Sequence, residues 1–179
     1  MEKITKKSIV STKNGDKGYS RNYSNEKIIK SDILFETLGT IDELSSNLGL
    51  TYHHAGRIDE IKVIQSVLQD INSVIATNPK SDNYQKLNLI NSENVLQLEE
   101  IEQDLLDKHP IEPKFVLPGS DTSLIGAYFD VSRSVARRAE RCVIRFEEQH
   151  KRSDLEYIKQ YINRLSDLLF IYARSLEKK

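Results

Sequence analysis

The sequence has few of the features that mark secreted or membrane-spanning proteins. Its one cysteine, Cys142, permits no disulfide within the chain, so a reducing, cytoplasmic location is expected. No stretch approaches the ~18 consecutive apolar residues of a membrane span. Residues 1–7 contain three lysines but are not followed by the apolar run of a secretory signal. Because 26 Lys and Arg nearly balance 27 Asp and Glu, the chain has no net field to attract nucleic acid or an anionic membrane, and we expect neither as a partner.

Glycine and proline are also scarce, with seven and four among 179 residues, as is typical of a compact helical protein. The length fits a single domain. Residues 1–33 lack helical periodicity and contain Gly15, Gly18 and several asparagines. We therefore predict that they form an arm of loop or short extended structure, mobile until a nucleotide binds it.

Five apolar stripes follow the arm, each with an apolar residue at every third or fourth position, as in amphipathic helices. The first runs over residues 34–48, with Gly49 weakening its end, and the third begins after Ser92 as candidate N-cap. The fourth stripe consists of Leu124, Tyr128, Val131, Val135, Ala139, Cys142 and Phe146. In the fifth, the three-four rhythm favours packing about 20° from antiparallel.

These stripes predict an all-α fold. We expect a five-helix, ferritin-like, up-and-down bundle over residues 34–179, or a four-helix bundle with one extra helix. With the arm of residues 1–33, it would form a single domain overall.

The fourth helix carries a row of arginines opposite its apolar stripe. Arg133, Arg137 and Arg141 are four positions apart, Arg138 lies at the edge of the stripe, and Glu140 is close enough to pair with Arg137. A solvated basic face is the plain interpretation of such a row. The alternative is a rigid clamp of guanidinium groups for phosphate or carboxylate.

Residues 11–20 of the arm could also bind an anion. Gly15 and Gly18 permit a tight loop with converging N–H groups, and Thr12, Lys13, Lys17 and Ser20 add donors. The loop is not a Walker A loop, because no glycine-lysine-serine or glycine-lysine-threonine sequence is present. Taken alone, it could also be an ordinary turn.

No metal site or nucleophile is visible. His53 and His54 are adjacent, so they cannot share a helix face as metal ligands. Cys142 lies in an apolar stripe and is expected to pack in the core.

Four segments together resemble the corrinoid adenosyltransferases of the PduO type, in that family's order. They are TKNGDKG at residues 12–18, LGTIDEL at residues 38–44, FVLPG followed by RRAER within residues 115–141, and YINRLSDLLF at residues 161–170. The chain departs from the family at Asn25 and Lys27, where relatives usually have glycine and arginine, and at Ser120, which replaces a second glycine.

The resemblance implies an enzyme that transfers the 5′-deoxyadenosyl group of ATP to Co(I) of cobalamin, forming adenosylcobalamin and releasing triphosphate. It further implies a homotrimer with a site at each subunit interface, Mg²⁺ bound through the ATP phosphates, and cobalamin as substrate. A reductase that supplies Co(I) from cob(II)alamin, and an adenosylcobalamin-dependent acceptor enzyme, would be partners.

The resemblance also implies the residues of the site. Arg133, Arg137 and Asp42 would be catalytic, with Asp42 pairing with Arg133 across the interface, and Phe115 would lie beside the corrinoid. The implied ATP-binding residues are Thr12, Lys13, Asn14, Gly15, Ser20, Arg21, Lys30, Arg137, Arg138, Ala139, Glu140, Arg141 and Asn163.

Two other classes of function remain open at this point. The same ATP and corrinoid pocket could belong to a non-catalytic sensor or delivery module. A plain helical scaffold is the third alternative, and it predicts no nucleotide-dependent shift in melting temperature.

Overall fold

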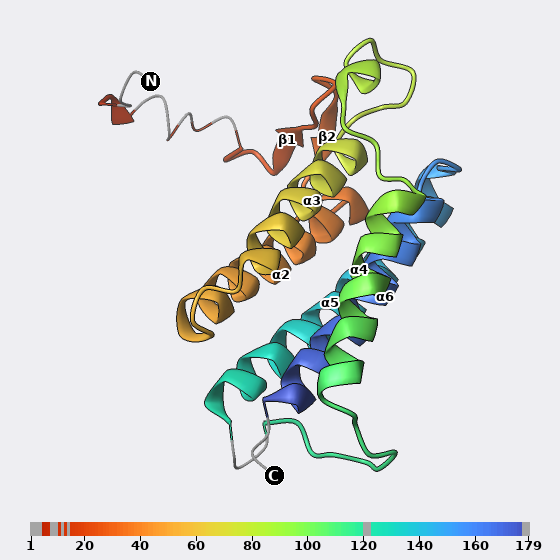
Figure 1. Ribbon diagram of the computed structural model, residues 1–179. Coiled ribbons are helices and arrows are strands. Elements are labelled where there is room, and N and C mark those ends of the chain that lie inside the picture. The colour runs from red at the N-terminus through yellow and green to blue at the C-terminus, as the bar shows by residue number, and fades with distance from the viewer. Residues whose placement is uncertain (1–4, 8–10, 12, 14, 120–122, 177–179) are drawn as a thin grey trace.

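A computed structural model describes residues 5–7, 11, 13, 15–119 and 123–176 of the chain. Five long α-helices dominate the described part, which confirms the predicted all-α fold (Figure 1). They are α2 (Ile33–His54), α3 (Asp59–Ile75), α4 (Ser92–Lys108), α5 (Leu124–His150) and α6 (Glu156–Ser175). A small hairpin, β1 (Tyr19–Arg21) and β2 (Lys27–Ile29), precedes them, and a 3₁₀ turn, η1 (Tyr84–Lys86), lies between α3 and α4.

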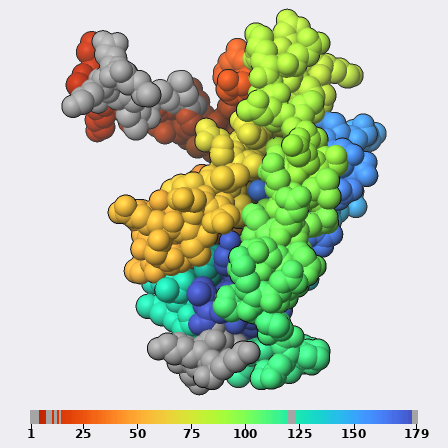
Figure 2. All heavy atoms as spheres, in the orientation of Figure 1, coloured from red at the N-terminus to blue at the C-terminus, as the bar shows by residue number. Residues whose placement is uncertain are grey.

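The helices pack in the order α3, α2, α5, α6, α4, because α2 contacts α3 and α5, and α6 contacts α5 and α4. The facing stripes form one apolar core. At one end of it the rings of Phe129 on α5 and Tyr172 on α6 stack with centroids 4.9 Å apart. The space-filling view shows the helices packed into one body (Figure 2). Among the described residues, no helix combines the length and apolar character that crossing a membrane requires.

Side chains define where the helices begin. The Asp32 carboxylate accepts a hydrogen bond from the N–H of Leu34 at 2.8 Å and caps α2. Ser92, the predicted cap of α4, is instead its first residue, because Asn91 forms a reciprocal capping box with Asn94. Asparagine at both positions satisfies the same N–H groups as the more familiar serine and glutamate pair.

Helix α2 does not weaken at Gly49 but continues to His54. The glycine serves close packing instead. A Cβ at Gly49 would lie 3.2 Å from Nε2 of Gln65 on α3, and this amide donates to the carbonyl of Ser45 at 2.8 Å. Gly49 therefore lets a side chain of α3 reach the backbone of α2.

The predicted stripe of α5 is wrong over its first two turns. Leu124 and Val131 are exposed, whereas Phe129 and Asp130 are buried. Here the buried face of α5 is set by α6, which Phe129 meets at Tyr172. From Val135 onward the predicted stripe is buried as expected, including Cys142.

The hairpin ties the later part of the arm to the bundle. The N–H of Tyr23 donates to the carbonyl of Ala76 at 2.8 Å, and the hydroxyl of Ser24 accepts from the N–H of Asn78 at 2.8 Å. Asn25 has a φ of 65° in the hairpin turn, a left-handed conformation that asparagine tolerates better than most residues. This docking limits the expected nucleotide-dependent ordering to residues before Tyr19.

At the same end of the bundle, Arg152 links the end of α3 to the turn between α5 and α6. Its guanidinium donates to the carbonyls of Val74 and Thr77 at 3.2 Å and pairs with Asp154. Burial disfavours a charged Asp154, but hydrogen bonds from Arg152 and Tyr84 outweigh it and lower the pKa of Asp154. Burial and the Asp154 charge raise the pKa of Tyr84 to about 12. The junction fixes the end of α3 next to the docked hairpin.

Candidate functional site

The loop before the hairpin adopts the tight conformation that its glycines predict. The N–H of Gly18 donates to the carbonyl of Gly15 at 3.2 Å, and Gly18 has a φ of 77°. A Cβ at Gly15 would lie 2.6 Å from the Nζ atom of Lys30, so the absence of a side chain lets this amine sit over the loop. Lys13 is at the loop's start with a φ of 58°. Thr12 and Asn14, also expected to bind ATP, lie outside the described residues.

The two predicted ATP ligands of β1 are held by the hairpin. Ser20 is half-buried and pairs in register with Ile28. Arg21 donates from Nη1 to the carbonyl of Asn25 at 2.6 Å, which fixes its guanidinium across the turn. The loop and hairpin thus present Lys13, Lys30 and Arg21 from one short segment.

Arg137 and Arg141 of the arginine row lie on an exposed face of α5, as predicted, whereas Arg133 is half-buried, with 25% of its side chain exposed. Arg138 forms an ion pair with Glu43 of α2, and Arg141 donates to the carbonyl of Arg137 at 2.9 Å. Arg137 forms no ion pair with a carboxylate of the described residues, and its side chain is exposed. Its charge is therefore available to an external anion.

Glu140 does not pair with Arg137 as its spacing suggested. Its Oε1 atom accepts instead from Nδ2 of Asn163 on α6, at 3.0 Å. Ala139 is fully buried beside this contact and packs in the core. The structure therefore joins Glu140 to Asn163, two predicted ATP-site residues from different helices.

Asp42 and Arg133 lie in different parts of the chain's surface. Asp42 is exposed and lines a polar groove between α2 and α3 with Lys62 and Gln65. Arg133 of α5 lines a different hollow, a cavity of about 580 Å³, together with Phe115. Among the described residues, the carboxylate paired with Arg133 is that of Asp130, at 3.8 Å from Nε. Within one chain, Asp42 and Arg133 are not brought together.

Residues of the segment 111–118 line this cavity. Phe115, the predicted corrinoid-side residue, is fully exposed at its mouth, and Phe170 of α6 forms part of its wall. An exposed phenylalanine beside a cavity is available to an apolar ligand.

Sequence reasoning missed two charged residues in the wall of the cavity. Asp130 of α5 and Arg174 of α6 are buried and form an ion pair at 2.5 Å. The apolar stripe expected for α5 placed Leu124 and Val131 inward and left Asp130 outside the core. No spacing in the sequence indicated that Asp130 is buried, because its burial depends on Arg174 of α6.

In the described part of the chain, no group of three or more His, Cys, Asp or Glu residues is arranged to hold a metal ion.

Comparison with known proteins identifies the family. The model of the cobalamin adenosyltransferase family matches residues 10–176. The chain belongs to this family. The resemblance noted in the sequence is thereby confirmed.

Individual relatives agree with this family assignment. The corrinoid adenosyltransferase MMAB of Bos taurus is 36% identical over 171 residues, covering 91% of this chain and 69% of that protein. A corrinoid adenosyltransferase of Citrobacter freundii is 33% identical and covers 91% of this chain and 92% of its own. A solved variant of the PduO-type ATP:corrinoid adenosyltransferase from Lactobacillus reuteri, complexed with cobalamin and ATP, matches with a TM-score of 0.81 at 30% identity, covering 93% and 92% of the two chains.

Proposed function

We propose that this protein is an ATP:corrinoid adenosyltransferase that joins the 5′-deoxyadenosyl group of ATP to the cobalt of a reduced cobalamin. The observation that carries the proposal is the family match over residues 10–176. The related structure from Lactobacillus reuteri holds both proposed substrates, cobalamin and ATP. The exposed arginines of α5, and the Lys30 amine over the loop at Gly15, supply the cationic groups that a triphosphate requires.

The reaction is a displacement at carbon. The Co(I) electron pair forms the Co–C bond to the 5′ carbon, and the C–O bond breaks with its pair passing to triphosphate. Cobalt is formally oxidised to Co(III), and the negative charge of the leaving group grows. Fixed guanidinium groups such as that of Arg137 stabilise this growing charge and lower the barrier.

The protein's other tasks are to bind and orient. Lys13, Lys30 and Arg21 would hold the phosphate chain from the arm, while Glu140 and Asn163 would orient the nucleotide on α5 and α6. Mg²⁺ would neutralise part of the phosphate charge when bound with ATP. Phe115 would shield the reacting face of the corrinoid from water.

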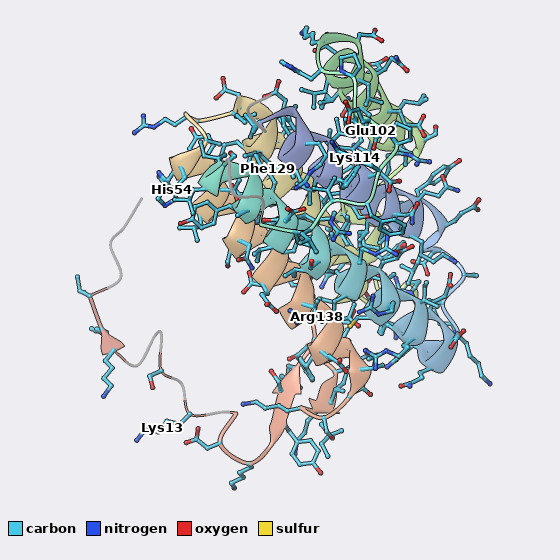
Figure 3. All side chains as sticks on the ribbon, turned by 90° about the horizontal axis from the view of Figure 1, so that it is seen from below. Lys13, His54, Glu102, Lys114, Phe129 and Arg138 are labelled. Carbon is cyan, nitrogen blue, oxygen red and sulfur yellow. The ribbon has the colours of Figure 1, made fainter. Side chains whose placement is uncertain are left out.

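We further propose that each site is shared between two subunits of a homotrimer. Lys13 lies away from the helices, while Arg138 lies on α5 (Figure 3). Arm and arginine row would then meet across an interface, and the exposed Asp42 would reach Arg133 of a neighbouring subunit. A cytoplasmic location, a reductase supplying Co(I) and an acceptor for adenosylcobalamin belong to the same proposal.

An anaerobic assay with pre-reduced cobalamin and ATP tests the function without the unknown reductase. The proposed enzyme converts the cob(I)alamin spectrum to that of light-sensitive adenosylcobalamin over many turnovers. A sensor or delivery module binds ATP, seen as a raised melting temperature, but forms no product. A scaffold shows neither, so either result contradicts the proposal.

A further inference from the structure

The buried ion pair of Asp130 and Arg174 stands out in the wall of the cavity. Only 5% of the Asp130 side chain and 3% of the Arg174 side chain are exposed, and the pair joins α5 to α6 at 2.5 Å. Taking both charges out of water is costly, and apolar residues of similar volume often stabilise a fold equally well. The pair thus calls for an explanation besides stability.

The carboxylate of Asp130 has two further contacts. Its Oδ2 atom accepts a hydrogen bond from the N–H of Gly119 at 3.0 Å, and its Oδ1 atom lies 3.8 Å from Nε of Arg133. Gly119 has a φ of 79°, a left-handed conformation that favours glycine and turns its N–H toward the helix. One buried carboxylate thereby connects α6, the end of the segment that lines the cavity, and Arg133.

The position of Gly119 gives this connection its significance. The segment at residues 111–118, which ends next to Gly119, lines the cavity and carries Phe115. Fixing the Gly119 N–H fixes where the segment returns to the bundle, and so where the phenylalanine stands. Arg174 in turn donates a hydrogen bond to the carboxylate at 2.5 Å and so fixes its orientation.

We propose that Asp130 is a positioning residue that seats the Phe115 segment over the corrinoid side of the site, with Arg174 holding it in place. The proposal rests on the proposed function and assigns to this pair a part of corrinoid recognition. It acts through Phe115 and Arg133 and does not require contact with the substrate. Its loss weakens corrinoid binding and leaves ATP binding largely intact.

Two matched double variants separate this role from stability. Asp130→Leu with Arg174→Met removes both charges and the acceptor and fills the space with apolar side chains. Neither charge is then left buried without its partner. Asp130→Asn with Arg174→Gln also removes both charges but keeps an oxygen that can accept from the Gly119 N–H. Comparing the two variants therefore isolates the effect of the hydrogen bond between residue 130 and the N–H of Gly119.

The first measurement is hydrogen exchange of peptides covering residues 111–119, which requires no activity. The Leu/Met variant should exchange this segment at least tenfold faster than wild type, with the helices unchanged, and the Asn/Gln variant should stay within threefold. In anaerobic steady-state assays, the Leu/Met variant should raise the KM for cob(I)alamin at least tenfold while the KM for ATP stays within twofold.

Unchanged exchange in the Leu/Met variant, or an equal effect in both variants, would overturn the proposal. A faster-exchanging segment with an unaltered KM for cob(I)alamin would overturn it as well. A failure of the proposed function would give a different result, because wild type itself would then form no adenosylcobalamin. The exchange comparison would still show whether the Asp130–Gly119 hydrogen bond holds the segment.

Discussion

Arg137 occupies the centre of the exposed arginine row and has no carboxylate partner among the described residues. We expect Arg137→Ala to reduce turnover about a hundredfold, corresponding to ~3 kcal/mol of transition-state stabilisation. The helical fold should persist because the side chain lies outside the core. Steady-state kinetics with circular dichroism measures both.

Arg145→Ala is the matched control for this prediction. Arg145 is an exposed arginine two turns further along α5, where it pairs with Glu36 at 2.9 Å. Its loss should change turnover by a few fold at most. Equal losses in the two variants would show that general charge, and not a specific clamp, is what matters.

Glu102 is a second residue with a testable property. Burial raises its pKa from 4.5 to about 7, with Asp167 and Glu99 adding to the shift and Arg164 opposing it. Its Oε1 atom is buried without a hydrogen-bond partner among the described residues. A raised pKa means that the fold favours the neutral form, so this contribution to stability is complete below pH 4.5 and is lost as the pH rises through about 7.

The variant Glu102→Gln cannot ionise and should escape this loss. We expect its melting temperature to exceed that of wild type by about 2–4 °C at pH 8, with little difference at pH 4.5. Thermal denaturation at the two pH values measures it. A difference that does not depend on pH would rule out ionisation of Glu102 as the cause.

Single residues were predictable from the sequence where periodicity alone decided their exposure. The arginine row required only the helical repeat, and Arg137 and Arg141 are on the face it indicated. Asp130 was not predictable in this way, because its burial depends on Arg174, which is 44 positions away. The pairing of Glu140 with Asn163 likewise depends on how two helices meet.

The hairpin is the element that divides the arm into two parts. Its hydrogen bonds to the end of α3 should protect Arg21 and Lys27 from trypsin whether or not ATP is present. Cleavage after Lys13 and Lys17, in the loop before it, should slow when ATP binds. Limited proteolysis followed by mass spectrometry distinguishes the sites. Equal cleavage after Lys13 and Lys17 with and without ATP would count against the loop as a nucleotide ligand.

At the scale of elements, all five helices were predictable from apolar spacing, but the cap of α4 and the continuation of α2 past Gly49 were not. The cap of α4 moved from Ser92 to Asn91 because two asparagines bond reciprocally, a pattern that neighbouring cap-forming residues obscure. Gly49 of α2 was misread as a weak point because Gln65, the side chain that needs the space beside it, lies on another helix. The hairpin has only three residues per strand, too few for an alternating pattern.

The whole molecule is proposed to act as a trimer whose sites need two subunits. Because Asp42 and Arg133 are not brought together in one chain, Arg133→Glu should remove most of the activity, and adding Asp42→Arg should restore part of it. Exchanging the charges restores the attraction but not the original geometry, so the rescue is partial. Light scattering of wild type should show three chains, and a fully active monomer would be incompatible with shared sites.

The most direct measurement for the central claim is product stoichiometry in the anaerobic reaction of cob(I)alamin with ATP. Displacement at the 5′ carbon predicts one triphosphate for each adenosylcobalamin formed, measured by phosphorus NMR and by the light-sensitive visible spectrum. Release of diphosphate, or consumption of ATP without a cobalt–carbon product, would contradict the account.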